Sequence, residues 1–379
     1  MPDTSGAWLT IEVDRSALIG NIQVFRDLVG PATRLLAVVK ADAYGHGLLL
    51  ASEAFLAGGA DWLGVHAVAE GECLRGAGIT APILVLGPAG AGEAARAADL
   101  DLDLTVASLP ALRAAATVGS SLKIHLKVET GVNRQGLIED ELDEVVSLLG
   151  EHPNLVPAGL TSHFADIEDT TDHTFASAQM ERFEAHRRRL SAAGLTAAAV
   201  HMTCSAATLL WDRAHGDMAR VGVGAYGIWP SRETRVAFRQ EKRQQIVLTP
   251  ALSWKVGISQ VRRVPAGQTV GYGRTWKAMT DSRIAVLPVG YSDGYPRALS
   301  GQAHVLVHGR RAPLVGRICM NLCMADVTHI PEAEAGDRAV LLGRQGDEVI
   351  TAEMLAEILG TIPYEVLTLP GPTWTRVAV

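Results

Sequence analysis

The chain is poor in lysine, cysteine and aromatic residues. Only six of its 34 lysine and arginine side chains are lysine, four residues are cysteine, and aromatic residues make up 5% of the 379 residues. Four cysteines in a chain of this length do not form a disulfide framework, so we expect buried free thiols and a reducing, cytoplasmic location. Because lysine is rare, each one is of interest. Lys40 is notable among them because it ends an apolar run.

Several classes of protein are disfavoured by what the sequence lacks. No apolar run is long enough to span a membrane, and the first residues do not have the basic and apolar regions of a signal peptide. The formal net charge of −7 disfavours nonspecific binding to nucleic acid. Cys319 and Cys323 have the spacing of half a metal site, but no second half follows, so we expect no metal. We therefore expect neither a nucleic-acid nor a membrane partner.

The length and the hydrophobic content indicate two domains. The chain is 48% hydrophobic, which is enough for a sizeable core, and 379 residues exceed one ordinary domain. We predict a first domain over residues 1–240 and a β-rich second domain over 241–379. The N-terminal segment 1–13 contains a short strand-like run and is predicted to associate with the second domain.

The first two-thirds of the chain alternates apolar runs with stretches of helical length. Continuous apolar strands separated by helices indicate a parallel sheet covered on its outer face. Eight such units in about 200 residues favour an α/β fold, a closed (β/α)8 barrel, over an open sheet. The predicted strands are Leu35–Lys40, Trp62–Ala67, Pro82–Gly87, Leu102–Ala107, Leu122–Val128, Val156–His163, Thr196–Thr203 and Arg220–Gly227.

Beyond about residue 240 the pattern changes to short strands separated by turn signals. Turns recur every 10 to 15 residues, as in a mostly antiparallel β domain. One late helix is predicted, with Thr351 as its N-cap and Leu359 near its end. In the first domain, Asp14 is a predicted N-cap for a helix that runs to about Leu28.

In a (β/α)8 barrel, functional groups lie at the carboxyl ends of the strands and in the loops that follow. Lys40 occupies such a position. Its amine either reaches solvent at the barrel mouth or forms a Schiff base, since burial lowers a lysine pKa and makes the amine nucleophilic. Gly45 and Gly47, which flank His46 just after Tyr44, allow close approach of a ligand to the backbone and favour the second interpretation.

The ends of the last two predicted strands suggest a phosphate site. Ser205 can offer a hydroxyl and is a predicted helix N-cap, and the backbone N–H groups of Gly222 and Val223 lie at the end of the last strand. A lysine and a phosphate site in the same barrel are the features that proteins use to hold pyridoxal phosphate. The sequence therefore suggests this cofactor.

Several motifs of the chain are similar to those of one enzyme family. Taken together they resemble the alanine racemases, pyridoxal-phosphate enzymes that interconvert L- and D-alanine. The similarity covers nearly the whole chain in family order. The motifs are AVVKADAYGHG at 37–47, KVETGVNRQG at 127–136, TSHFA at 161–165, CSAATLL at 204–210, RVGVGAYG at 220–227, VGYGRTW at 270–276, VGYSDGYPR at 289–297, GRICMN at 316–321 and GTIPYE at 360–365.

The resemblance implies a two-base enzyme that works as a homodimer. By similarity, Lys40 binds the cofactor through a Schiff base and is the base on one face of the substrate α-carbon. Tyr272 is the base on the other face and comes from the partner subunit. Arg220 faces the pyridine nitrogen, and His163 links Arg220 to Tyr272.

The resemblance also implies the remaining ligands. Arg134 and the Met320 backbone N–H bind the substrate carboxylate. Lys127 matches a position that is carbamylated in many relatives, where it orients Arg134. The product would be D-alanine for cell-wall synthesis. The implied phosphate ligands are Tyr44, Ser205, Gly222, Val223 and Tyr364.

Elementary chemistry agrees with these roles. Racemisation removes a proton from one face of a carbon and returns it on the other, so two groups must flank that carbon. An arginine opposite the pyridine nitrogen stays charged and accepts no proton, so the nitrogen remains unprotonated. We infer that this suppresses transamination.

The sequence departs from the family pattern at a few positions. Asparagine is usual at Cys204, aspartate at Asn321 and proline at Val221, and the C-terminal residues differ. Three alternatives stay open at this point. They are a racemase that prefers serine or other small amino acids, a pyridoxal-phosphate decarboxylase of similar plan, and a non-catalytic barrel. The decarboxylase lacks support because we see neither its cysteine-based motif nor its glycine-rich phosphate loop.

Overall fold

The computed structural model describes residues 8–242, 245–371 and 374–379, and the chain divides into two compact units. The barrel unit contains Ser16–Ala43 and Leu48–Thr249. The C-terminal unit contains residues 8–15, the short segment Tyr44–Gly47 and the described residues of Pro250–Val379. Residues 1–7 of the predicted N-terminal segment lie outside the described residues.

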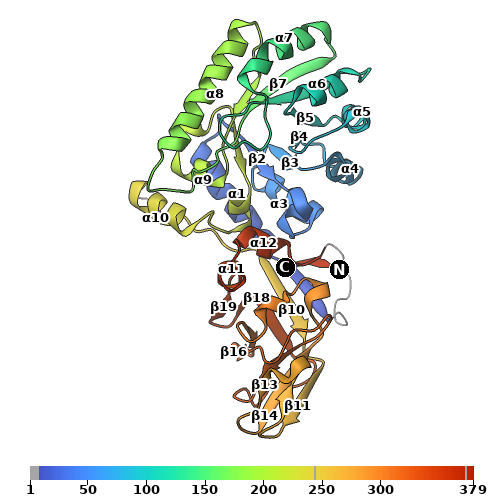
Figure 1. Ribbon diagram of the computed structural model, residues 1–379, viewed down its shortest axis with the longest axis vertical. Coiled ribbons are helices and arrows are strands. Elements are labelled where there is room, and N and C mark those ends of the chain that lie inside the picture. The colour runs from blue at the N-terminus through green and yellow to red at the C-terminus, as the bar shows by residue number, and fades with distance from the viewer. Residues whose placement is uncertain (1–7, 243–244, 372–373) are drawn as a thin grey trace. The chain divides into compact units, whose positions relative to one another are not determined.

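The barrel unit is built on eight parallel strands (Figure 1). They follow one another in the order β8-β7-β6-β5-β4-β3-β2-β9, and every ladder between neighbours is parallel. The end strands are joined by side chains, since the backbone N–H of Arg220 donates to the Thr203 hydroxyl at 2.8 Å. The strands are β2 (Arg34–Val38), β3 (Trp62–Val65), β4 (Ile83–Val85), β5 (Asp103–Val106), β6 (Leu122–Lys127), β7 (Leu155–Thr161), β8 (Ala199–His201) and β9 (Met218–Val221).

Helices surround these strands (Figure 1). Several of the side chains that they bury are small. Helix α5 buries Ala94 and Ala97, and α6 buries Leu112 and Ala115. Such aliphatic faces explain how the chain builds a core with few aromatic residues. The helices are α1 (Arg15–Val29), α3 (Leu48–Ala57), α4 (Val68–Gly76), α5 (Ala91–Asp99), α6 (Leu109–Ala116), α7 (Leu142–Glu151), α8 (Thr174–Ala192), α9 (Ser205–Leu210) and α10 (Arg232–Glu241).

All eight predicted barrel strands extend past the carboxyl ends of the observed strands, and two of these ends carry candidate site residues. The run predicted to end at Lys40 leaves the sheet after Val38, and Lys40 starts a short turn, α2 (Lys40–Tyr44). The run predicted over Arg220–Gly227 ends at Val221. It is followed by a 3-10 helix, η3 (Val223–Tyr226), because Gly222 has φ −106° and ψ −108°, which breaks the extended backbone.

The C-terminal unit is mostly β, as predicted. Its largest sheet has the order β16-β15-β18-β10-β1-β20, with β19 paired to β18. Strand β1 (Leu9–Val13) pairs antiparallel with β10 (Leu252–Gly257) and parallel with β20 (Arg376–Ala378). The other strands are β11 (Gln260–Val264), β12 (Thr269–Val270), β13 (Trp276–Lys277), β14 (Ser282–Leu287), β15 (His304–Val307), β16 (Arg310–Pro313), β17 (Cys323–Asp326), β18 (Arg338–Gln345) and β19 (Glu348–Ile350).

Two helices complete this unit. Helix α11 (Ala352–Leu359) begins where predicted, since the Thr351 hydroxyl accepts a hydrogen bond from the Met354 N–H at 3.2 Å. The second helix, α12 (Pro363–Thr368), was not predicted. It is only six residues long, too short for an apolar repeat to reveal it, although its proline at the first turn is a helix-start signal.

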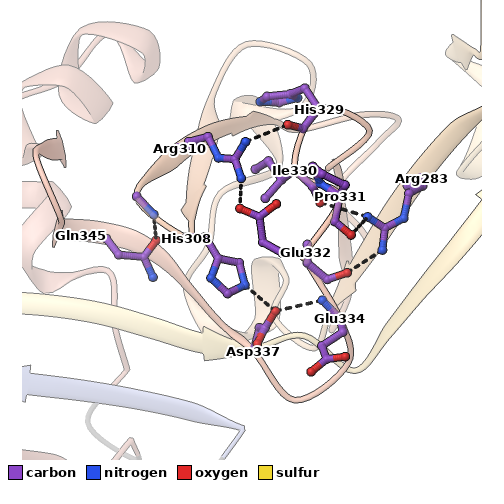
Figure 2. Close-up of polar contacts among 12 residues, drawn as sticks. Arg283, His308, Arg310, His329, Ile330, Pro331, Glu332, Glu334, Asp337 and Gln345 are labelled. Carbon is purple, nitrogen blue, oxygen red and sulfur yellow. Dashed lines mark hydrogen bonds and ion pairs between the residues drawn. The ribbon is translucent and has the colours of Figure 1, made fainter.

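A polar cluster fixes the loop that joins β17 to β18 (Figure 2). Arg283 on β14 donates to the carbonyl groups of Ile330, Pro331 and Ala333 at 3.0, 2.7 and 2.6 Å. The His308 ring lies 2.7 Å from the Asp337 carboxyl. This arginine satisfies backbone groups that the loop cannot pair in a ladder.

Across the described residues, we find no helix that is both long and apolar enough to cross a membrane.

Candidate functional site

Lys40 is held by a strained backbone turn at the carboxyl end of β2. Ala41, Asp42 and Ala43 have φ angles of 56°, 52° and 53°, a left-handed conformation that costs roughly 1–2 kcal/mol for each non-glycine residue. The Ala41 N–H donates to Glu70 at 2.8 Å, and Asp42 accepts from the Leu48 N–H at 2.8 Å. These contacts stabilise a turn that the sequence would not adopt alone.

The Lys40 amine is half-buried, and its pKa is lowered. Burial is the main cause, the positive charge of Arg134 adds to it, and Glu70 opposes it. A lowered pKa increases the fraction of neutral, nucleophilic amine. Lys40 therefore has the chemical character that a Schiff base requires.

Arg220 is fixed by neutral groups of the neighbouring strands. Its guanidinium donates to the Thr161 hydroxyl at 2.9 Å, to the Ser162 carbonyl at 2.8 Å and to the His201 ring at 2.5 Å. The residue is 6% exposed, and burial lowers its pKa to about 10, so it stays charged at neutral pH. Sequence reasoning missed His201, whose only signal was its place at the end of a predicted strand.

His163 is kept neutral beside Arg220. The pKa of His163 is lowered to about 3 by burial first, and then by the positive charges of Arg220, Arg134, Lys127 and Lys40. Arg220 donates to its Nδ1 at 3.3 Å, which assigns the ring proton to Nε2. Three of these cationic residues lie at or beyond the carboxyl ends of strands, since Lys40 follows β2, Lys127 ends β6 and Arg134 lies in the loop after β6.

Lys127 and Arg134 belong to this cationic group. Lys127 is the last residue of β6, and its pKa is lowered to about 8 by burial and by the charges of Arg134 and Arg220, with Glu129 opposing. No carboxylate forms an ion pair with Lys127 within the described part of the chain. Glu129 instead accepts from the Gly131 N–H at 2.5 Å. Arg134 is exposed on the loop that follows.

The predicted phosphate ligands of the barrel unit meet at α9. Ser205 is the first residue of that helix rather than its N-cap, which is Cys204. The error is one residue, because serine is a common cap and cysteine is not. The Ser205 hydroxyl accepts from the N–H groups of Gly222 and Gly224 at 3.0 and 3.2 Å. Val223, buried, begins the adjoining turn.

The remaining candidates lie in the C-terminal unit, and two of them form a pair. The ring centroids of Tyr44 and Tyr364 are 6.3 Å apart. Gly45, at φ 81°, approaches α12 so closely that a Cβ there would lie 2.2 Å from the Leu367 carbonyl oxygen. The Gly45 carbonyl also accepts from Arg376 at 3.0 Å. These contacts all lie within the C-terminal unit, to which Tyr44–Gly47 belongs.

Tyr272 and Met320 present side chains to solvent. Tyr272 is 73% exposed in a turn between Gly271 and Gly273, both with positive φ. Met320 is 56% exposed, and its carbonyl accepts from the N–H and the hydroxyl of Ser292 at 3.0 and 2.9 Å. Single exposed side chains of this kind are common on protein surfaces, so their exposure alone defines no contact surface.

The fold and the barrel site define a class. The barrel carries a lysine with a lowered pKa, a buried arginine and a helix start with a serine hydroxyl, which is the arrangement of a (β/α)8-barrel enzyme with a carboxyl-end site. Comparison with known proteins gives the family. The family models described as alanine racemase N-terminal domain and C-terminal domain match residues 13–230 and 251–378. The chain belongs to the alanine racemase family.

Individual relatives match over almost the whole length. The alanine racemase of Desulfosudis oleivorans is 40% identical over 376 residues, covering 96% of this chain and 94% of that protein. The alanine racemase of Leptospira interrogans is 34% identical, covering 100% of this chain and 97% of that protein.

Solved structures agree. An alanine racemase from Bacillus anthracis with bound L-Ala-P has a TM-score of 0.91 at 33% identity, covering 98% of this chain and 95% of that one. An alanine racemase from the D-cycloserine producer Streptomyces lavendulae has a TM-score of 0.88 at 33% identity, covering 98% and 97%. These similarities confirm the predicted fold class, a (β/α)8 barrel followed by a mostly β domain.

Proposed function

We propose that the chain interconverts L- and D-alanine with pyridoxal phosphate, by a two-base mechanism. The observation that carries the proposal is the end of the barrel at which a lysine amine of lowered pKa, a neutral histidine and a buried arginine occur together. The family relationship supports alanine as the substrate. D-alanine made in this way would supply cell-wall synthesis.

The side chains present fit the proposed cofactor. Lys40 would hold it covalently, since its amine is partly neutral, and Arg220 would face the pyridine nitrogen. The phosphate would bind at the start of α9 through Ser205 and the N–H groups of Gly222 and Val223, with Tyr44 and Tyr364 as further ligands. When bound, the cofactor supplies an electron sink that acidifies the substrate α-proton.

The chain's own groups then control the proton. Lys40 removes or returns it on one face of the α-carbon, and Tyr272 of the partner subunit does so on the other. Arg220 cannot accept a proton at neutral pH, so the group that it faces stays unprotonated, which limits transamination. His163, neutral and hydrogen-bonded to Arg220, would connect that arginine to the tyrosine.

Substrate orientation is assigned to two further groups. Arg134 and the backbone N–H of Met320 would bind the alanine carboxylate. Lys127 would be carbamylated and would orient Arg134, an assignment supported by its pKa of about 8 and by the cationic neighbours that a carbamate would balance. Carbon dioxide adds only to the neutral amine, which a pKa near 8 makes available.

We propose that the protein forms a homodimer and that it is located in the cytoplasm. The exposed rings and side chains of Tyr272, Tyr291, Met320 and Leu322 support a contact surface on the C-terminal unit. The free thiols of the four cysteines, of which Cys323 is buried, support a reducing compartment.

The test is chiral analysis of purified protein incubated with L-alanine and pyridoxal phosphate. We expect D-alanine to form until both enantiomers are equal, and kcat/KM to be higher for alanine than for serine. Lys40→Ala should lose both the visible absorbance of the bound cofactor and all racemisation, whereas Lys277→Ala, at an exposed position, should keep both. A clear serine preference, or a retained absorbance band in washed Lys40→Ala protein, would contradict the proposal.

A further inference from the structure

A chain of hydrogen bonds crosses the interior of the barrel unit. The Asp103 carboxyl lies 3.1 Å from Nε2 of His125, and Nδ1 of His125 lies 2.8 Å from Nε2 of His201. Nδ1 of His201 lies 2.5 Å from the Arg220 guanidinium. The four side chains come from β5, β6, β8 and β9, so no local sequence pattern connects them.

The four side chains of this hydrogen-bonded row are deeply buried, which is unusual for a row that ends in two charged groups. His125 is 0% exposed, His201 1%, Asp103 3% and Arg220 6%. Among the residues that the structure describes, Asp103 is the only buried carboxyl group and Arg220 the only buried lysine or arginine. Within the described residues, the two buried charged side chains, Asp103 and Arg220, are thus the two ends of one row of hydrogen bonds.

The direction of every hydrogen bond follows from Arg220, which can only donate. His201 must therefore accept at Nδ1 and, being neutral because burial holds its pKa well below the ordinary value, carries its proton on Nε2. That proton is donated to Nδ1 of His125, which leaves the His125 proton on Nε2. This last proton is donated to Asp103, so all three bonds point from the guanidinium to the carboxyl.

We propose that Asp103 acts through His125 and His201 as the counter-charge of Arg220 and as a positioning residue for it. A buried guanidinium is costly without a compensating charge, and the other side-chain and carbonyl partners of Arg220 are neutral. Two imidazoles polarised in the same direction carry the influence of the carboxyl to the guanidinium. The role of Arg220 opposite the cofactor nitrogen rests on the proposed function; the counter-charge does not.

The surroundings of His125 and Asp103 support the proposal. A Cβ at Gly159 on β7 would lie 2.1 Å from Nδ1 of His125, so only glycine leaves room for the ring there. The β6–β7 register also shifts between Ile124 and His125. Asp103 lines a cavity of about 220 Å³ together with Arg34 and Lys123, at the amino end of the strands.

The first experiment uses unmodified full-length protein labelled with ¹⁵N-histidine. Two-dimensional ¹⁵N NMR at pH 7 reports which ring nitrogen carries the proton. We expect His125 and His201 to be neutral with the proton on Nε2. A proton on Nδ1 of either ring would overturn the proposal. This measurement needs neither cofactor nor turnover, so its outcome is independent of the proposed function.

The second experiment compares Asp103→Asn with Asp101→Asn, a control that removes an exposed carboxyl of the same cavity. In D103N, the amide that replaces the carboxyl can still accept from His125 but lacks the charge. We expect the Nε2–H resonances of both histidines to move upfield in D103N and to stay in place in D101N. An unchanged His201 resonance in D103N would overturn the assignment of Asp103 as the counter-charge of Arg220.

Kinetics of the holoenzyme test the positioning role. In D103N we expect kcat to fall about 10- to 100-fold with KM changed less than about twofold, since Arg220 would not touch the substrate. D101N should keep both constants within about twofold. Equal kcat values in the two variants would overturn the positioning role. If D103N does not fold, the tautomers of the unmodified protein still decide whether the hydrogen bonds run from Arg220 to Asp103.

Discussion

The ring of His125 lies against the backbone of Gly159 on the neighbouring strand, so close that no side chain fits at position 159. An added Cβ would approach the ring atoms Nδ1, Cγ and Cε1 to 2.1, 2.5 and 2.6 Å. Both residues are in the middle of their strands, β6 and β7. A glycine inside a strand weakens it, so this position is explained by the close approach of the ring.

Gly159→Ala should therefore destabilise the protein by about 1–3 kcal/mol, because the methyl group overpacks a buried site. Urea denaturation measures this change in the free energy of unfolding. The control is Gly20→Ala in α1, where a Cβ meets nothing within 4 Å and alanine should be neutral or stabilising by up to about 1 kcal/mol. Equal stability of the two variants would contradict the steric explanation.

Acid should weaken the barrel through its buried neutral histidines. The pKa of His163 is lowered to about 3, and that of His201 is also well below its ordinary value. The unfolded state therefore binds protons first, so stability is fully present above pH 6.5 and is lost as the pH falls toward 3. Urea denaturation at pH 7.5 and pH 5 should show this decrease.

His163→Asn removes one of these groups and should reduce the pH dependence. His66→Asn, at an exposed position, measures the effect of losing any histidine. If the two variants lose stability equally between pH 7.5 and pH 5, burial of His163 in its neutral form is not the cause.

Lys127 should take up carbon dioxide and Lys123 should not. The two lysines lie on the same strand, but the pKa of Lys127 is lowered to about 8, whereas a hydrogen bond from Lys123 to Asp101 raises the pKa of Lys123. With ¹³C-bicarbonate at pH 8, ¹³C NMR should show a carbamate signal. The signal should vanish in Lys127→Ala and persist in Lys123→Ala; the reverse pattern would refute the assignment.

Loss of the Tyr272 hydroxyl should affect the two enantiomers unequally. In Tyr272→Phe, we expect α-proton exchange with deuterated solvent to fall at least about 100-fold for one enantiomer of alanine and far less for the other, because only one face loses its base. Proton NMR of each enantiomer measures the exchange. Tyr291→Phe, a second exposed tyrosine of the C-terminal unit, should affect both enantiomers alike. Equal losses in Tyr272→Phe would argue against two bases.

The positions of the barrel strands could be predicted because each is a short apolar run between helical stretches. The strand ends were harder to predict, since the left-handed turn after Lys40 contains two alanines, which disfavour that conformation, and only one aspartate. That turn depends on Glu70, which is far along the chain, and the sequence does not show such a contact. Helix α12 was too short to be recognised.

The candidate residues could be recognised from sequence motifs, but the residues that hold them in place could not. Lys40, Lys127, His163 and Arg220 stand at strand ends, where barrel chemistry is expected. Asp103 and His125 instead lie at the start and in the middle of strands, positions that usually indicate packing. Their significance depends on side chains from four strands meeting inside the barrel, and only three-dimensional structure shows this.

The position of β1 has a consequence for synthesis on the ribosome. This strand is synthesised well before its partners β10 and β20, which end at Gly257 and Ala378. At roughly 5–20 residues per second, its last partner follows about 20–70 seconds later. During that interval Leu9, Ile11 and Val13, which are buried in the finished sheet, remain exposed. We therefore expect the nascent chain to need protection from aggregation until β20 has been made.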